Sequence, residues 1–161
     1  LATSFPGAHC VGGDIDPTGA ARARAGVREA GLEGRITVLE GDVAEVVQAA
    51  SCAAVVMIEV LHEISPHLRP HVVGACARAL DAGGWLLIVD ETYPATLAEA
   101  RDPEFRFPLQ TGFEELLWGN VLPTRAEQES LLRSAGFSGE IRRELIGEGF
   151  TVLAVQKPRA R

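Results

Sequence analysis

The 161-residue sequence has little of what a disulfide scaffold, a membrane protein or a nucleic-acid binder needs. Its three cysteines are odd in number and widely spaced, which argues against a disulfide framework and favours a reducing cytoplasm. The apolar run 53–58 is far shorter than the roughly 20 residues of a membrane span, and no signal pattern opens the chain. Lys and Arg number 15 against 22 Asp and Glu, and this net charge of −7 argues against binding through nucleic-acid phosphates. We therefore expect a soluble protein that has no membrane or nucleic-acid partner.

The remaining composition, 47% hydrophobic and 23% charged, is that of one globular domain over residues 1–161. Strand-like apolar segments alternate with helix-like segments along the chain. We expect strands at 9–14, 35–40, 53–58 and 85–91 and helices at 17–30, 43–50 and 66–80. This alternation predicts an α/β fold with a doubly wound, mostly parallel sheet. The runs 53–58 and 85–89 lack polar alternation, which predicts strands covered on both faces.

The C-terminal third departs from this alternation. Residues 92–123 hold four prolines and several aromatic residues, which predicts a lid or a wall of a substrate pocket. A capping box at Thr124 and Glu127 begins a helix that reaches Ala135. The connection between strands at 140–145 and 150–156 is too short for a crossover helix. The last two strands are therefore expected to pair antiparallel.

Four acidic residues follow four of the expected strands: Asp14, Asp42, Glu59 and Glu91. Ligands of open parallel sheets bind beyond the carboxyl ends of the strands, so these residues are site candidates. Each could instead cap a helix or lie in solvent. A carboxylate at position 14 suits the hydroxyls of an unphosphorylated ribose, whereas Asp16, followed by a proline, suits the helix N-cap.

Several short motifs occur in order: Gly12-Gly13-Asp14-Ile15-Asp16-Pro17, Glu40-Gly41-Asp42-Val43, Glu59-Val60-Leu61-His62-Glu63 and Leu80-Asp81-Ala82-Gly83-Gly84. With the closing segments 135–137 and 150–158, they resemble a class I S-adenosylmethionine-dependent methyltransferase over nearly the whole chain. The string from Val60 to Glu63 is similar to that of small-molecule O-methyltransferases. The resemblance implies a Rossmann-like sheet with an antiparallel C-terminal hairpin.

The resemblance also implies how the cofactor, S-adenosylmethionine, is held. Asp14 would bind the ribose, and Asp42 would accept a hydrogen bond from the adenine amino group. Val43 and Ile15 would lie on either side of the adenine ring. Glu59 would lie near the methionine moiety.

One element of the family pattern is missing, because the chain contains no GxGxxG or comparable glycine-rich loop. The family places that loop after its first strand, roughly 20 residues before the ribose-binding acid. With that acid at Asp14, the loop would precede Leu1, which is not a methionine. We therefore expect the C-terminal part of a longer protein, without the first, central strand, so that the two halves of the sheet stay unpaired.

Methyl transfer to a hydroxyl needs positioning and a base. His62 follows a strand, and the unperturbed pKa of a histidine lies near neutral pH, which makes it the first candidate. It could instead order its loop or pack under the lid expected at 92–123. Glu91 is a second catalytic candidate. Glu114 and Glu115 are alternative bases or substrate anchors.

A metal site is not predicted. His67 and His71 lie four residues apart, but an HExxH motif beginning at His62 fails because Pro66 takes the second ligand position. The sequence thus favours methyl transfer from S-adenosylmethionine to a small molecule, at a hydroxyl oxygen, by a protein that could form a homodimer. A nicotinamide-dependent oxidoreductase and a non-catalytic scaffold of the same fold are the alternatives.

Overall fold

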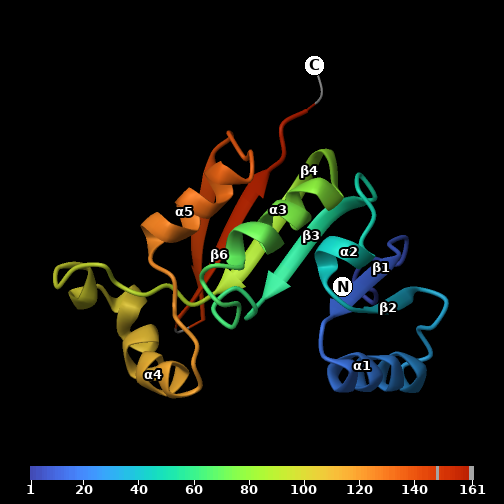
Figure 1. Cartoon of the computed structure of the whole chain (residues 1–161), viewed down its shortest axis with the longest axis horizontal. Coiled ribbons are helices and arrows are strands. Elements are labelled where there is room, and N and C mark those ends of the chain that lie inside the picture. Colours follow the sequence, from blue (N-terminus) through green and yellow to red (C-terminus); the bar gives the residue numbers. More distant parts are fainter. Residues whose placement is uncertain (148, 160–161) are drawn as a thin grey trace. The chain divides into compact units, whose positions relative to one another are not determined.

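The computed structural model describes residues 1–147 and 149–159. It contains two compact units, Leu1–Gln48 and Ala49–Arg161 (Figure 1). Each unit has its own sheet, so within the described residues the strands form one sheet of two strands and one of four. The α/β class is confirmed, and the separation into two sheets is the arrangement that the sequence predicts.

The first unit is a strand–helix–strand motif followed by a short helix. Strands β1 (Cys10–Asp14) and β2 (Ile36–Glu40) pair in parallel and are joined by α1 (Pro17–Glu29). Asp16 caps α1 through its side chain, with a proline in the first turn as predicted. Helix α2 (Val43–Val46) is shorter than expected, because Val47 already has an extended backbone.

The second unit is built on a mixed sheet with the order β3-β4-β6-β5. Strand β3 (Cys52–Ile58) pairs in parallel with β4 (Leu80–Asp90). Strand β6 (Phe150–Gln156) pairs antiparallel with both β4 and β5 (Ile141–Ile146). The predicted C-terminal hairpin is therefore confirmed, and Glu148 in its connection lies outside the described residues.

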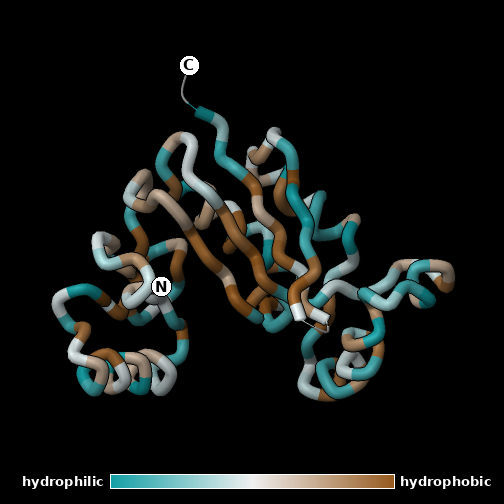
Figure 2. The backbone as a smooth tube through the Cα atoms, turned by 180° about the vertical axis from the view of Figure 1, so that it is seen from behind, coloured by the Kyte–Doolittle hydropathy of each residue, from teal (hydrophilic) through white to brown (hydrophobic). Residues whose placement is uncertain are grey.

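Helices α3 (Arg69–Ala79) and α5 (Arg125–Ser134) cover one face of this sheet (Figure 1). Hydrophobic residues concentrate along its strands (Figure 2), and buried positions alternate with partly buried ones from Gly84 to the end of β4 and along β6. The core joins residues from the helices and the sheet, among them Val73, Cys76, Leu132, Leu86, Ile88, Leu153 and Val155. Burial of this apolar surface is the main source of stability in this unit.

Some expectations for the second unit were wrong. Strand β3 is not buried on both faces, since Val56 and Ile58 are exposed and Met57 is its single buried residue. Helix α3 begins at Arg69 rather than Pro66, because residues 66–68 form a turn. Strand β4 begins at Leu80, which pairs with Cys52 across a register shift.

The insertion 92–123 contains helical structure that the sequence did not predict. Two 3-10 turns, η1 (Glu99–Arg101) and η2 (Pro103–Phe105), lead into α4 (Arg106–Leu117). Pro108 lies in the first turn of α4, where the missing N–H breaks no helical hydrogen bond. Across residues 1–147 and 149–159, none of the helices has the length and apolar character needed to cross a membrane.

Candidate functional site

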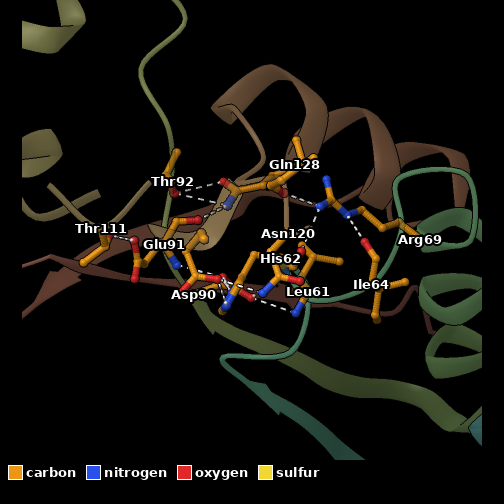
Figure 3. A network of polar contacts seen from close by, with 12 residues as sticks. Leu61, His62, Ile64, Arg69, Asp90, Glu91, Thr92, Thr111, Asn120 and Gln128 are labelled. Atoms are coloured by element: carbon orange, nitrogen blue, oxygen red, sulfur yellow. Dashed lines mark hydrogen bonds and ion pairs between the residues drawn. The ribbon is translucent and has the colours of Figure 1, made fainter. Parts of the chain in front are cut away.

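The carboxyl ends of β3 and β4 bring two parts of the chain together. These strands are parallel neighbours, so the loop after β3 meets the end of β4. The Asp90 carboxylate accepts hydrogen bonds from the backbone N–H groups of Leu61 at 2.8 Å, of His62 at 3.3 Å and of Glu91 at 2.8 Å (Figure 3). Asp90 is 1% exposed, so these bonds compensate for burying its charge. The loop that carries His62 is thus fixed to the end of β4.

The same carboxylate holds the ring of His62. The distance from His62 Nδ1 to Asp90 Oδ1 is 2.7 Å, and the histidine is 5% exposed. This hydrogen bond raises the pKa of His62, while burial works against it. A carboxylate on Nδ1 fixes the ring so that Nε2 is the nitrogen able to exchange a proton with a reactant. A buried, oriented imidazole of this kind is suited to general base chemistry.

Helix α4 supplies a second carboxylate to the same ring. Glu115 Oε2 lies 3.6 Å from His62 Nε2 and accepts a hydrogen bond of 2.8 Å from Asn120 Nδ2. Glu115 is buried, whereas its neighbour Glu114 is exposed. Of these two alternative bases, the structure therefore brings Glu115 to His62 and leaves Glu114 on the surface.

Glu91, the second catalytic candidate, is buried beside this pair. Its side chain accepts a hydrogen bond of 2.6 Å from the Thr111 hydroxyl on α4, and its backbone carbonyl faces Gln128 Nε2 on α5 at 3.5 Å (Figure 3). Burial raises the pKa of the Glu91 carboxyl, and the bond from Thr111 opposes that shift. Glu91 thus lies among residues of the insertion and α5.

Arg69 holds the surrounding backbone in place. Its guanidinium donates to the carbonyl oxygens of Ile64 at 2.9 Å and His62 at 3.2 Å (Figure 3). It also donates to the carbonyl oxygen of Val121. Burial lowers the pKa of Arg69, which is 3% exposed. These bonds link the His62 loop to the segment that returns from α4. In contrast to His62, the other two histidines considered, His67 and His71, are exposed.

Sequence reasoning missed Asp90, Arg69 and Asn120. Asp90 could have been found, because buried positions alternate along β4 and place residue 90 on the same face as Leu86 and Ile88. Arg69 and Asn120 carry no comparable signal. Their partners depend on how the insertion packs, which no local pattern in the sequence shows.

The cofactor candidates of the first unit lie at the carboxyl ends of β1 and β2. Asp14 Oδ1 accepts a hydrogen bond of 2.9 Å from the backbone N–H of Asp16. Ile15 is 74% exposed. Asp42 caps α2 by accepting a hydrogen bond of 2.8 Å from Ala44 N, and Val43 begins that helix. The capping role left open for Asp42 is therefore present.

Glu59, the cofactor candidate of the second unit, follows β3. Its side chain is exposed, and its backbone N–H donates to the Val89 carbonyl at 2.8 Å. Its φ angle is +52°, a conformation that residues other than glycine adopt rarely. Such strain is concentrated at functional sites, which keeps Glu59 a candidate.

Comparison with known proteins shows what this chain is similar to. A family model described as "Methyltransferase domain" matches residues 1–84. No curated protein matches the chain. Among solved structures, an O-methyltransferase family protein from Burkholderia thailandensis has a TM-score of 0.81 and 20% identity, covering 99% of this chain and 47% of its own.

Two further solved structures resemble the chain. PigF, solved with SAH, has a TM-score of 0.74 and 23% identity over 97% of this chain and 45% of its own. The mitomycin 7-O-methyltransferase MmcR has a TM-score of 0.78 and 22% identity over 97% and 44%. At these identities the likeness concerns the fold alone. The chain spans about half the length of the structures that it matches.

Proposed function

Since the chain belongs to the methyltransferase-domain family, we propose that it takes part in methyl transfer from S-adenosylmethionine to a hydroxyl oxygen of a small molecule. The observation that carries the proposal is the buried pair of His62 and Asp90 at the carboxyl ends of two parallel strands. A base at this position suits an acceptor that must lose a proton, as a hydroxyl does. The names of the O-methyltransferases similar in fold support the choice of oxygen.

Two features of the first unit fit this cofactor. Ile15 exposes 74% of its surface next to the end of β1, and an adenine ring would cover that apolar side chain. The Asp14 carboxylate lies so close to Gly19 that a Cβ added to the glycine would be 2.1 Å from Oδ2. Gly19 therefore leaves room for a carboxylate, which can bind the hydroxyls of a ribose.

We assign the remaining cofactor residues on the family resemblance. Asp42 would accept from the adenine amino group, Val43 would contact the ring, and Glu59 would bind near the methionine moiety. S-adenosylmethionine, when bound, supplies an electrophilic methyl group. The protein's part in the reaction is to position the acceptor, exclude water and take up its proton.

His62 would perform that proton transfer. Asp90 holds Nδ1, so the acceptor hydroxyl would donate its proton to Nε2. Asp90 would stabilise the imidazolium that results. Glu91 would lie near the acceptor as a second catalytic candidate. Burial raises the pKa of its carboxyl, so this group stays protonated to a higher pH than usual.

Calorimetry with S-adenosylhomocysteine and, separately, with NAD tests the cofactor. We expect S-adenosylhomocysteine to bind and NAD not to bind. Binding of NAD instead would support an oxidoreductase, and binding of neither would support a non-catalytic scaffold. Mass spectrometry of acceptors incubated with S-adenosylmethionine would then identify the atom that is methylated.

Finer expectations belong to the same proposal. We expect a cytoplasmic protein that acts on a small molecule, without nucleic acid or membrane as a partner and with a homodimer as the candidate assembly. Cys10, Cys52 and Cys76 are free thiols, which supports a reducing location. Sedimentation of the purified protein would test the homodimer.

A further inference from the structure

Each ring nitrogen of His62 faces a carboxylate, so neither is open to a reactant in this structure. Asp90 occupies Nδ1 at 2.7 Å, so a reactant can exchange a proton only with Nε2. That nitrogen faces Glu115 Oε2 at 3.6 Å, and the histidine is 5% exposed. A hydroxyl acting as proton donor needs to come within hydrogen-bond distance of Nε2. It would therefore take the place that Glu115 occupies in this structure.

Glu115 is fixed in that place by the turn that ends α4. Asn120 Nδ2 donates to Glu115 Oε2 at 2.8 Å, and the backbone N–H of Asn120 donates to the Glu115 carbonyl at 2.9 Å. Gly119 makes the turn with a φ of +89°, and Arg69 then bonds the carbonyl of Val121. The Glu115 carboxylate is thus held by the same segment that Arg69 fastens to the His62 loop.

We propose that Glu115, held by Asn120, is a positioning residue that occupies the Nε2 side of His62 until an acceptor hydroxyl displaces it. This inference rests on the proposed function, because it takes His62 as the base. It goes beyond that function by giving the insertion a defined task. The insertion would keep the base closed and charged before the acceptor arrives.

The charges around His62 explain how displacement of Glu115 would convert the imidazolium of His62 into a neutral base. Asp90 and Glu91 approach from the end of β4, Glu115 from α4, and Glu63 and Arg69 from the loop and α3. A carboxylate on each ring nitrogen favours the imidazolium, which cannot accept a proton. When Glu115 moves away, the pKa of His62 falls and the Nε2 proton leaves to water. Neutral Nε2 then accepts the proton of the acceptor hydroxyl.

NMR titration of the His62 ring tests the proposal without any cofactor or acceptor. In Glu115→Gln the midpoint should move to lower pH than in the unsubstituted protein, and Asn120→Ala should move it in the same direction by a smaller amount. Glu114→Gln on the same helix is the matched control, because Glu114 is exposed, and its midpoint should not change. An unchanged midpoint in Glu115→Gln would overturn the proposal.

A second measurement tests access to Nε2. Diethyl pyrocarbonate modifies neutral, accessible imidazoles, and exposed His67 in the same chain is an internal reference. We expect Glu115→Ala to speed the modification of His62 several-fold relative to His67, and equal ratios would contradict the closure. A His62→Ala variant with normal turnover would disprove the proposed function, whereas both Glu115 measurements would still report on the positioning contact.

Discussion

The cofactor candidates of the first unit and the residues around His62 in the second are held in place by different kinds of contact. Asp14 and Asp42 bond backbone groups two residues away, and Ile15 is exposed. Asp90, by contrast, bonds His62 across 28 residues of sequence, and both are buried. Local contacts can be inferred from spacing along the chain. Contacts of the second kind appear only once the sheet and the insertion are assembled.

This difference predicts distinct consequences for mutations. Changes in the first unit should act on the cofactor with little effect on the fold, since the candidates are exposed or locally bonded. Changes around His62 should alter turnover, stability and pH dependence together, because the same buried bonds serve the fold and the base.

The largest effect is expected for His62→Ala. Loss of a general base typically slows turnover by about 10²–10⁴-fold. Affinity for S-adenosylhomocysteine should stay close to that of the unsubstituted protein, because His62 is assigned to the acceptor. Steady-state kinetics and calorimetry measure the two quantities, with His67→Ala as a control at an exposed histidine. Unchanged turnover would remove His62 from the mechanism.

Asp90→Asn should reduce stability and turnover together. Removing one partner of a buried ion pair costs about 3 kcal/mol, and the amide can no longer fix the His62 ring as a carboxylate does. The loss should be measured as the free energy of unfolding in urea, with circular dichroism confirming the folded state. A stability equal to that of the unsubstituted protein would show that the pair is not formed in solution.

The loss of stability in Asp90→Asn should also depend on pH. Asp90 raises the pKa of His62 in the folded protein, so the stabilisation by their charges is complete below the pKa of an unfolded histidine, near 6.5. It is lost as the pH rises through the raised pKa of the folded state. The difference in unfolding free energy between Asp90→Asn and the unsubstituted protein should therefore shrink as the pH rises from about 6.5 through the raised pKa of His62. A difference independent of pH would contradict a charged pair.

The sequence was sufficient for elements whose signals are local. Asp16 as the cap of α1, the Thr124 and Glu127 capping box and the antiparallel hairpin were all predicted and are present. Helix α4 was not predicted, because the prolines and aromatic residues of 92–123 indicated only a lid or a pocket wall, although Pro108 falls where a helix tolerates it. The strand-end rule found Glu91 but not Asp90, one residue earlier, whose partners come from the loop after β3.

Asp14→Ala should weaken the binding of S-adenosylhomocysteine by about 10- to 100-fold, because a hydrogen bond to a charged group contributes about 1.5–3 kcal/mol. Turnover at saturating cofactor should stay the same. Asp16→Ala is the matched control, since Asp16 accepts from the backbone of Thr18 and Gly19 and should affect only the stability of α1. Calorimetry on both variants tests whether Asp14 binds the ribose. An equal loss of affinity for S-adenosylhomocysteine in the two variants would mean that Asp14 acts only as a second cap of α1.

The smallest effect is expected for Ile15→Ala. Ile15 is 74% exposed, so its truncation should change the stability of the free protein by less than about 0.5 kcal/mol. The affinity for S-adenosylhomocysteine should fall by a few fold. The adenine ring would no longer bury the carbon atoms that the substitution removes from Ile15, and that burial contributes about 1 kcal/mol. Calorimetric binding and urea unfolding, measured on the same sample, separate the effect on affinity from the effect on stability. A loss of stability with unchanged affinity would mean that Ile15 packs against protein in solution, and the first unit would then depend on long-range contacts as the second does.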